Sequence, residues 1–275
     1  MTTRLDAWEG RSLAELARGW GAAGLHVFGR LGSTNDLARG LAAAGSAAGT
    51  VVIAEEQVAG RGRVGRAWSS PPGLGLWVSV VARPTGDPSF LPLRVGLAVA
   101  EALEGFLPVS VRLKWPNDLV VGRSKLGGIL CEGSWEAGGT GFVIVGVGLN
   151  VLHTASDFPA EIRDRATSLA ILAGAAPDRG AVADTVVPSI LGVLAGPSAL
   201  TPELLDRLSA RDALRGSKVE VTDPSSGERL AAGIAVGIAM DGSLLVESGE
   251  GPPRSIRSGT VRMIDTSTHA KRTGE

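Results

Sequence analysis

The sequence predicts an α+β protein, with a large N-terminal domain of strands and helices and a small C-terminal β-barrel. Strand-length apolar runs and helix-length amphipathic segments alternate through residues 31–210. After Gly216 the pattern changes to short runs of alternating apolar and polar residues, separated by turn clusters such as DPSSGE and DGS. The 275 residues, 44% of them hydrophobic, are enough for one large and one small domain. We expect domains over residues 1–216 and 217–265, and a frayed, disordered polar tail over residues 266–275.

The first half of the large domain predicts one helix and two strands. LGSTNDLARGLAAAG, residues 31–45, is typical of a helix that has Ser33 or Thr34 as its N-cap and a glycine at its end. TVVIAEEQ, residues 50–57, is typical of a buried strand, and residues 75–84 predict a second strand. The segment between these two strands is therefore a connecting loop.

The rest of the chain predicts further strands between helical regions. Residues 91–106 form an amphipathic helix that ends before Pro108. Four strands are expected to follow, in VSVRLKW (109–115), LVVG (119–122), KLGGILCE (125–132) and GFVIVGVGLNV (141–151). Residues 181–210 are helical in pattern, and we expect the helix to be broken at Pro188, Pro197 and Pro202. The barrel strands are expected in SKVEVTD (217–223), ERLAAGIAVGIA (228–239), GSLLVES (242–248) and TVRMI (260–264).

Composition limits the classes of function. The 27 basic and 28 acidic residues give a formal charge of -1, so no overall field attracts nucleic acid or an anionic membrane, and any anion site must be local. The single Cys131 cannot form an intrachain disulfide, and the start of the chain lacks the apolar run of a secretion signal. We therefore expect a cytoplasmic protein without a membrane span. The three histidines lack zinc-ligand spacing and no G-x-S-x-G motif is present, which argues against a zinc enzyme or a hydrolase triad.

The most unusual stretch is GRGRVGRAWSS, residues 60–70. Its glycines match G-x-G-x-x-G, but a dinucleotide site needs a helix to start there, and the following WSSPPG cannot form one. A P-loop is also excluded, because Arg66 and Ala67 replace the lysine and hydroxyl residue. A glycine-rich loop that carries Arg61, Arg63 and Arg66 suits phosphate and carboxylate groups, which guanidinium binds through paired hydrogen bonds. A solvated basic loop with no chemical role is the alternative.

We expect this segment, which we call the lid, to be disordered when empty and to close over a bound anion. Ordering its eleven residues costs roughly 11–22 kcal/mol at ~1–2 kcal/mol per residue, and its like charges repel one another in the empty loop. Charge-assisted hydrogen bonds of roughly 1.5–3 kcal/mol each offset much of this cost only when a ligand is present.

The stretch RLKWPNDLVV places Lys114 at a strand end and Asn117 with Asp118 in a turn. One interpretation is an ordinary hairpin turn, since Pro-Asn-Asp is common in turns. The other is that a lysine and a carboxylate at the rim of a sheet bind a phosphate and its magnesium ion.

Two glycine pairs follow. GRSKLGGILCE places Lys125 just ahead of Gly127 and Gly128, so that a ligand or another strand can approach the backbone closely; an ordinary surface lysine is the alternative. In VIVGVGLN, Gly146 and Gly148 clear one face of a strand, either for a ligand or for tight helix packing. Together these groups favour chemistry without a general base. A substrate carboxylate is already a nucleophile, and an Arg/Lys cluster with magnesium stabilises charge as it attacks a phosphate.

Five motifs, taken in order, resemble the biotin protein ligases: GSTN, EEQVAGRGRVGRAW, KWPNDL, SKLGGIL and GVGLN, between Gly32 and Asn150. The resemblance implies a class II synthetase-like mixed sheet with helices on one side, and an SH3-like C-terminal β-barrel. It also implies that biotin and ATP give biotinyl-5'-adenylate and pyrophosphate, and that a lysine of the biotin carboxyl carrier domain of an acyl-CoA carboxylase then takes the biotinyl group. Biotin, ATP and Mg²⁺ would be substrates and activator, with no tightly bound prosthetic group. We expect a monomer or weak homodimer.

The resemblance also implies roles for individual residues. The catalytic groups are expected to be Lys125, Arg63 and Arg61. The biotin site is expected to comprise Ser33, Thr34, Asn35, Gln57, Arg61, Gly62, Arg63, Lys125, Gly128, Gly146 and Gly148. The nucleotide site is expected to comprise Arg66, Trp68, which packs on adenine, Lys114, Asn117, Asp118 and Asn150, with Asp118 also as a Mg²⁺ ligand.

The chain departs from the family pattern in some places. The motifs begin at Gly32, which leaves too little chain for the winged helix-turn-helix of some members, so we expect neither DNA binding nor repression. Gly127 stands where alanine is often found, and Val58 and Val64 stand where polar or basic residues also occur. Two other functions stay open: a lipoate-type ligase, against which the RGR and KWPND motifs argue, and a non-catalytic biotin or nucleotide sensor. A sensor would not need Lys125 and all three lid arginines.

Overall fold

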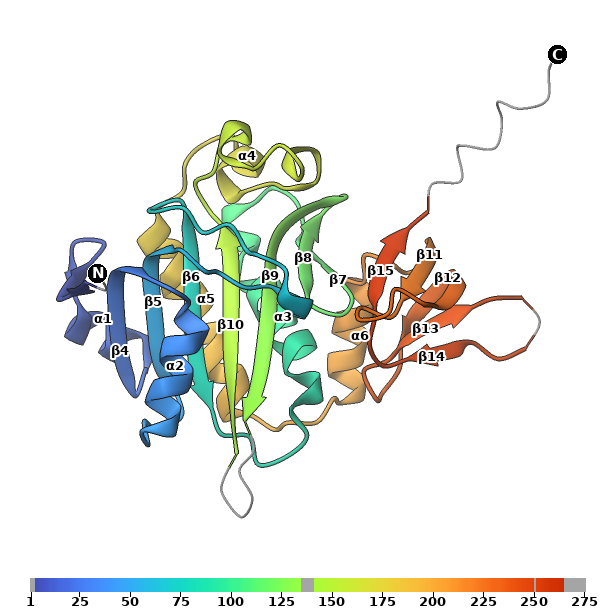
Figure 1. Ribbon diagram of the computed structural model, residues 1–275, viewed down its shortest axis with the longest axis horizontal. Helices are drawn as coiled ribbons and strands as arrows, with labels where there is room; N and C mark the ends of the chain where they lie inside the picture. Colours follow the sequence, from blue (N-terminus) through green and yellow to red (C-terminus); the bar gives the residue numbers. More distant parts are fainter. Residues whose placement is uncertain (1–2, 135–140, 250, 265–275) are drawn as a thin grey trace.

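The computed structural model describes residues 3–134, 141–249 and 251–264. These residues form a large domain and a smaller β-domain that lie side by side along the long axis of the molecule (Figure 1). The tail predicted over residues 266–275 lies outside the described residues. Within the described ranges, no helix combines the length and the apolar character that a membrane crossing requires.

A mixed sheet of eight described strands forms the centre of the large domain, in the order β1-β4-β5-β6-β10-β9-β8-β7. β4 and β5 run parallel, and every other neighbouring pair is antiparallel. Every residue of β6 is buried, because both faces of the sheet are covered. The strands are β1 (Arg4–Leu5), β4 (Gly24–Leu31), β5 (Thr50–Gln57), β6 (Gly75–Ala82), β7 (Arg112–Lys114), β8 (Asp118–Val121), β9 (Ser124–Ser134) and β10 (Phe142–Asn150).

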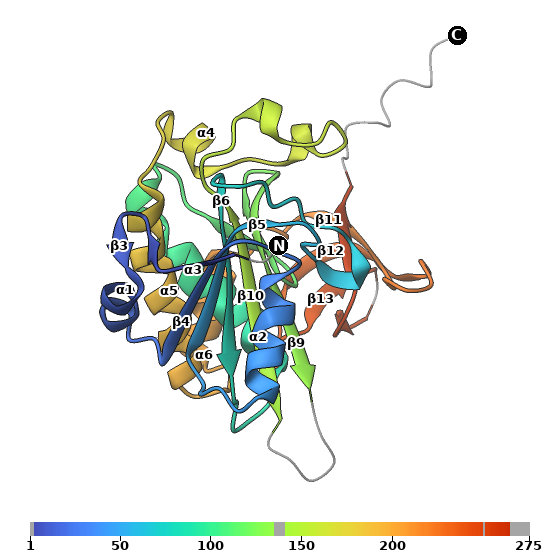
Figure 2. The ribbon, with the colours of Figure 1, turned by 60° about the vertical axis from the view of Figure 1, so that its left-hand side comes forward.

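Helices pack on both faces of this sheet. The helices are α1 (Leu13–Trp20), α2 (Thr34–Ala43), α3 (Leu91–Ala102), α4 (Leu169–Ala173), α5 (Arg179–Ala195) and α6 (Pro202–Ala210). Figure 2 shows α1, α3 and α5 on one side of the sheet and α2 on the other. Alternate residues of β5 supply the two cores: Val51 belongs to the larger cluster under α1, α3 and α5, and Val52 to the smaller cluster under α2. The predicted one-sided covering thus describes most of the helices, and α2 is the exception that borders the site.

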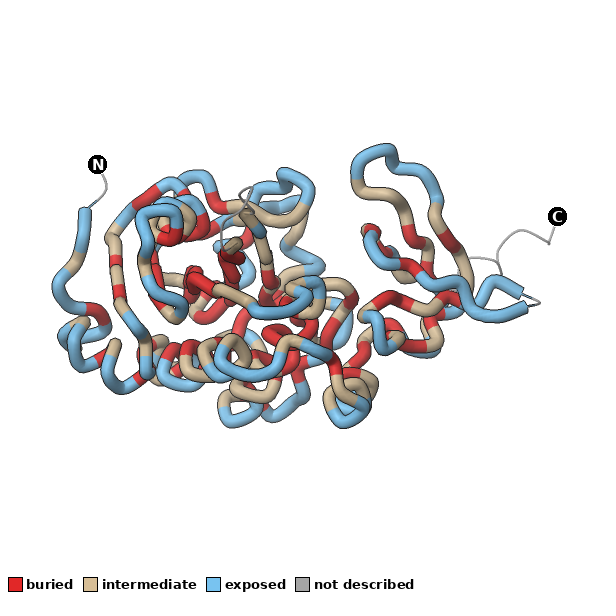
Figure 3. The backbone as a smooth tube through the Cα atoms, turned by 90° about the horizontal axis from the view of Figure 1, so that it is seen from below, coloured by how far each residue is buried: buried red, intermediate tan, exposed pale blue. Residues whose placement is uncertain are grey.

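Short elements complete the large domain. A small hairpin of β2 (Ala7–Trp8) and β3 (Arg11–Ser12) precedes α1. Single 3-10 turns are formed by Arg63–Gly65, Pro88–Phe90, Glu104–Phe106, Ala155–Asp157 and Arg163–Arg165. Buried residues run through the interior of both domains, while the turns are exposed (Figure 3).

The small domain is a five-stranded antiparallel sheet in the order β14-β13-β12-β11-β15. Its strands are β11 (Lys218–Thr222), β12 (Arg229–Ile238), β13 (Leu244–Glu247), β14 (Arg254–Ile256) and β15 (Thr260–Met263). It is tied to the large domain because the Trp115 indole N–H donates to the carbonyl of Gly242 at 3.0 Å. α6 contacts both α3 and β12 at the same junction.

Most predicted elements are confirmed, including β5, β6, β10 and α2 with Ser33 as its N-cap. The elements of residues 4–31, α4 and β14 were not predicted from the sequence. The predicted break at Pro188 is wrong, since α5 continues through it. A proline removes one helical hydrogen bond, but α5 buries its apolar residues on both sides of Pro188, among them Val186 and Ile190, and this burial outweighs the loss.

Candidate functional site

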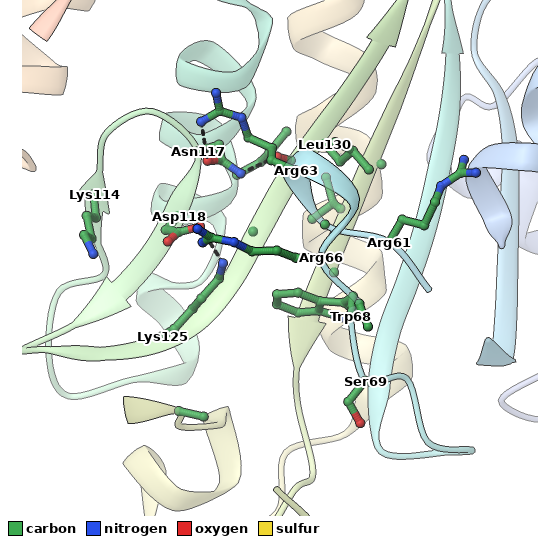
Figure 4. Close-up of a pocket in the computed structure, with 18 of the residues that line it drawn as sticks. Arg61, Arg63, Arg66, Trp68, Ser69, Lys114, Asn117, Asp118, Lys125 and Leu130 are labelled. Carbon is green, nitrogen blue, oxygen red and sulfur yellow. Dashed lines mark hydrogen bonds and ion pairs between the residues drawn. The ribbon is translucent and has the colours of Figure 1, made fainter. Parts of the chain in front are cut away.

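A cavity of about 660 Å³ lies on the same face of the sheet as α2. The N-terminus of α2, the lid, β8, β9 and β10 line it, together with the segment around residues 153–166 and the start of β15. Figure 4 shows Arg63, Arg66 and Trp68 of the lid pointing toward Asn117, Asp118 and Lys125 on the opposite side. A cavity of this size accommodates a small-molecule ligand.

The floor of the cavity is made by two glycines of β10. A Cβ on Gly146 would lie 3.0 Å from Cγ of Asn35 and closer still to its Oδ1, and a Cβ on Gly148 would lie 2.8 Å from Nε1 of Trp68. Gly128 on β9 pairs with Gly148, and a Cβ there would lie 3.4 Å from Nζ of Lys125. Side chains from α2, the lid and β9 therefore pack directly on the backbone of these glycines. A residue with a Cβ at these positions would collide with them or crowd them.

One end of the cavity is polar and uncharged. At the start of α2 the Thr34 N–H donates to Oε1 of Gln57 at 2.8 Å, so a side chain from the end of β5 satisfies this helix terminus. The Thr34 hydroxyl donates to the same oxygen at 3.0 Å, and the Gln57 Nε2 donates to the Ser70 hydroxyl at 2.8 Å. The hydroxyl of Ser79 on β6 lies 2.7 Å from Oγ1 of Thr34 and 2.6 Å from Oδ1 of Asn35. Such a set of neutral donors and acceptors suits an uncharged polar ring.

The lid is a short irregular hairpin. The Trp68 N–H donates to the Gly60 carbonyl at 2.9 Å and pairs the two sides of the lid. Below it, the N–H of Gln57 at the end of β5 donates to the Ser70 carbonyl at 3.1 Å. The Gly62 N–H donates to the Arg66 carbonyl at 2.7 Å and closes the tip. The structure thus shows the lid in a closed conformation, and its disorder without ligand stays a prediction.

The other end of the cavity is strongly cationic. Lys125 Nζ lies 2.5 Å from Oδ1 of Asp118 and 5.1 Å from the ring centre of Trp68. Arg63 donates to Oδ1 of Asn117 at 3.3 Å, and the amide nitrogen of Asn117 donates to the carbonyl of Ile129 at 2.8 Å. Burial lowers the pKa of Arg63, and the nearby Asp118 raises it in part.

Lys114 adds to this excess of positive charge. Burial lowers the pKa of Lys114, and Lys125, Arg123 and Arg66 lower it further, while Asp118 raises it. Arg66 points toward Asp118 in Figure 4. Among the residues that the structure describes here, Lys114, Lys125, Arg63 and Arg66 outnumber the one carboxylate, Asp118, and an entering anion would relieve their mutual repulsion. This arrangement can hold phosphate oxygens or a carboxylate and stabilise charge that develops there.

Arg61 has different partners from the other lid arginines. Its guanidinium extends away from Arg63 and Arg66 (Figure 4). Its Nη2 lies 2.6 Å from Oδ1 of Asp36 and 3.2 Å from Oε2 of Glu132. Arg61 still lines the cavity, but the catalytic role expected for it stays a prediction.

An aromatic wall stands behind Trp68. Trp68 meets Trp77 edge to face at 6.3 Å, Trp77 meets His153 at 5.9 Å, and His153 stacks on Phe158 at 4.9 Å. Burial lowers the pKa of His153, so its ring is neutral at neutral pH and behaves as part of the apolar wall.

Asn150, expected to contact nucleotide, donates to the carbonyl of Thr167 at 2.9 Å.

Some buried polar atoms at the site have no partner. Within the described residues, these atoms are Nδ1 of His153 and two donors, the indole N–H of Trp68 and the Nε–H of Arg61. Buried donors are rarely left unpaired in native proteins. The two donors both belong to the lid, and both are explained if the lid shifts or gains an acceptor when a ligand binds.

Comparisons with known proteins agree with this geometry. The model of the biotin/lipoate A/B protein ligase family matches residues 27–150, and that of the biotin protein ligase C terminal domain matches residues 216–263. The biotin--[acetyl-CoA-carboxylase] ligase of Mycobacterium tuberculosis is 36% identical over 249 residues, which are 87% of this chain and 90% of that protein. The chain belongs to the biotin protein ligase family.

Other relatives are similar over different lengths. The biotin protein ligase from Aquifex aeolicus in complex with biotin and ATP superposes with a TM-score of 0.73 at 30% identity, covering 88% of this chain and 99% of that one. The bifunctional ligase/repressor BirA of Bacillus subtilis is 39% identical over 155 residues, 55% of this chain. That match covers 48% of BirA, so the chain spans about half the length of this relative.

The five biotin protein ligase motifs meet at one cavity in the structure. The residues predicted for the biotin and nucleotide sites all line this one cavity. The sequence analysis missed Ser79, Glu132, His153 and Phe158. Ser79 could have been found, because it is the single hydroxyl residue in the otherwise apolar run LWVSVVA. No such signal marks Glu132, which meets α2 and the lid only through the fold.

Proposed function

We propose that this chain activates biotin with ATP to biotinyl-5'-adenylate and transfers the biotinyl group to a lysine of the biotin carboxyl carrier domain of an acyl-CoA carboxylase. One observation carries the proposal. A single cavity joins a neutral polar end to a cationic end across a glycine floor, and one lid covers both ends. The names of the Mycobacterium tuberculosis ligase and of the Aquifex aeolicus complex with biotin and ATP support the same assignment.

In the first step the neutral end would hold the ureido ring of biotin, through Thr34, Asn35 and Gln57. The carboxylate of biotin would then extend over Gly146 toward Lys125 and Arg63. One carboxylate oxygen attacks the α-phosphorus of ATP, the bond to the bridging oxygen breaks, and pyrophosphate leaves with the electron pair. Lys125 and Arg63 would stabilise the added negative charge, so no general base is required.

In the second step the neutral amine of a carrier lysine attacks the acyl carbonyl of the adenylate. The amide bond forms as the bond from the carbonyl carbon to the phosphate oxygen breaks. AMP leaves with the electron pair, and the amine nitrogen gives up one proton to water. Trp68 would cover the nucleotide by packing on adenine, beside the aromatic wall. Lys114, Arg66, Asn117 and Asn150 would contact the nucleotide.

Magnesium would enter with ATP. Asp118 and Asn117 offer a carboxylate and an amide oxygen, which are donor types that Mg²⁺ accepts, and such ions are often held by one or two carboxylates plus phosphates. Among the described residues no group of three or more His, Cys, Asp or Glu side chains could hold a metal. The phosphate oxygens would therefore supply much of the coordination shell.

The test is a transfer assay. The protein is incubated with ATP, Mg²⁺ and a carboxylase carrier domain, with either biotin or lipoate, and the carrier is weighed by mass spectrometry. Addition of one biotinyl group supports the proposal. A carrier modified only with lipoate would establish the lipoate ligase instead, and binding of biotin without any product would establish a sensor.

A further inference from the structure

Glu132 lies where β9, α2 and the lid meet. Its Oε2 accepts a hydrogen bond from Nδ2 of Asn35 at 2.7 Å and lies 3.2 Å from Nη2 of Arg61. Its Oε1 lies 3.1 Å from Nη2 of Arg39, one turn along α2 from Asn35. One carboxylate therefore contacts a residue of the neutral end of the cavity and an arginine of the lid at the same time.

The contact with Asn35 decides which way its amide group faces. A carboxylate only accepts hydrogen bonds, so the hydrogen-bond network assigns the amide nitrogen to Glu132 and leaves Oδ1 toward Ser79 and the floor. The Ser79 hydroxyl has one proton, and both Oγ1 of Thr34 and Oδ1 of Asn35 compete for it. Asn35 thus keeps acceptor capacity for an N–H of a ligand. A rotated amide would present its N–H₂ group instead and repel such a donor.

The contact with Arg61 holds one side of the lid. The Arg61 and Glu132 side chains are 35% and 25% exposed, so solvent screens their pair less than it screens a surface pair. Burial raises the pKa of Glu132, but the hydrogen bond from Asn35 and the charges of Arg61 and Arg39 outweigh it, and the pKa lies below its ordinary value. The carboxylate is thus ionised at neutral pH, as both contacts require.

We propose that Glu132 is a positioning residue that couples recognition of the ligand head group to closure of the lid. It orients the Asn35 amide so that its oxygen meets a ureido N–H, and the same oxygen atom of Glu132 anchors Arg61. This inference rests on the proposed function, because it takes biotin as the ligand of the neutral end.

Two variants separate the two contacts. Glu132→Gln keeps an amide oxygen that accepts from Asn35 but loses one of the two carboxylate charges that hold Arg61. The other is Asp36, at 2.6 Å from Arg61. Biotin affinity without ATP should change less than about threefold, while release of preformed biotinyl-adenylate should become about tenfold faster, the effect of losing one charge-assisted contact. Glu132→Ala loses both contacts, so biotin affinity should also fall by about tenfold or more.

The matched control is Arg39→Gln. Arg39 touches the same carboxylate but contacts neither the cavity nor the lid. Both affinity and release should therefore stay within about twofold of the unchanged protein, the scale of an exposed ion pair. Affinity is measured by calorimetry, release by a chase with unlabelled biotin and ATP, and folding by the melting temperature.

The outcomes are distinct. Wild-type affinity and release in Glu132→Gln and Glu132→Ala overturn the inference, as does an equal effect of Arg39→Gln, which would show a general charge effect. If Glu132→Ala lowers the melting temperature, the test rests on Glu132→Gln, in which adenylate release should be faster while biotin affinity is nearly unchanged. If the unchanged protein biotinylates its carrier and Glu132→Gln shows the same biotin affinity and adenylate release, this inference fails but the proposed function stands. An unchanged protein that binds no biotin overturns both.

Discussion

Replacing Gly146 with alanine tests whether the glycine floor admits the head group of the ligand. The new methyl group would lie 3.0 Å from Cγ of Asn35, with Oδ1 nearer still. Since apolar atoms prefer separations of about 3.5–4.0 Å, the amide must move by roughly 0.5–1 Å. The amide then loses its hydrogen bonds to Ser79, at 2.6 Å, and to Glu132, at 2.7 Å. At about 0.5–1.5 kcal/mol for the neutral bond and 1.5–3 kcal/mol for the charged one, the loss is about 2–4.5 kcal/mol.

Titration calorimetry with biotin in the absence of ATP measures this loss directly. If only half of this free energy is lost from biotin binding, the dissociation constant should rise at least about fivefold. If all of it is lost, the rise should reach about 2000-fold. Gly40→Ala is the matched control, because Gly40 lies on the same helix as Asn35 and a Cβ there meets nothing within 4 Å. A helix glycine replaced by alanine should bind biotin normally and melt slightly later. Gly146→Ala with the affinity of the unchanged protein would refute the assignment of this floor to biotin.

Three other changes test the cationic end, the lid and the domain junction. Lys125→Ala should slow adenylate formation by orders of magnitude without changing the melting temperature greatly; near-normal pyrophosphate release would remove Lys125 from the site. Val64 has φ of 58°, a left-handed conformation that costs a non-glycine residue roughly 1–2 kcal/mol. Asparagine tolerates this conformation, so Val64→Asn should stabilise the lid and slow adenylate release by about fivefold. Faster release would contradict this. Asp212 is buried between α6 and β11. Burial raises its pKa, so its ionised form costs stability. This cost is absent below the unfolded pKa, grows as pH rises from the unfolded to the folded pKa, and is constant above it. Asp212→Asn should therefore gain melting temperature relative to the unchanged protein between pH 4 and pH 7, and a constant difference across that range would refute the account.

The elements that could be predicted carry strong local signals. β5 and β10 are long apolar runs, and the glycines of VIVGVGLN had to share one face because side chains alternate along a strand. The elements missed over residues 4–31 are of two kinds. α1 carries a clear local signal, a capping box of Ser12 and Glu15 with Gly21 at its end, and could have been predicted. The strands carry only weak local signals. β1, β2 and β3 have two residues each, and β4 contains Gly29, His26 and Arg30. The division into domains at residues 216 and 217 stays a prediction.

Tertiary contacts fix the N-terminal segment instead. The Trp8 indole donates to Glu55 at 2.5 Å, and the Arg179 guanidinium donates to the same carboxylate at 2.9 Å while it lies over the Trp8 ring. These partners are separated by 47 and 124 residues along the chain. No periodicity within a short window contains such information, so the small hairpin that carries Trp8 could not be predicted from it.

Arg61 and Arg63 show the same limit inside the site. Their spacing, two residues apart in GRGR, predicts side chains on the same side of an extended segment. The lid is extended only as far as Gly62, and a 3-10 turn begins at Arg63. The turn sends Arg63 to Asn117 beside β8, while Arg61 reaches Glu132 on β9. The lid is therefore fastened on both sides of the cavity, and a ligand that spans the cavity meets one anchor at each of its ends.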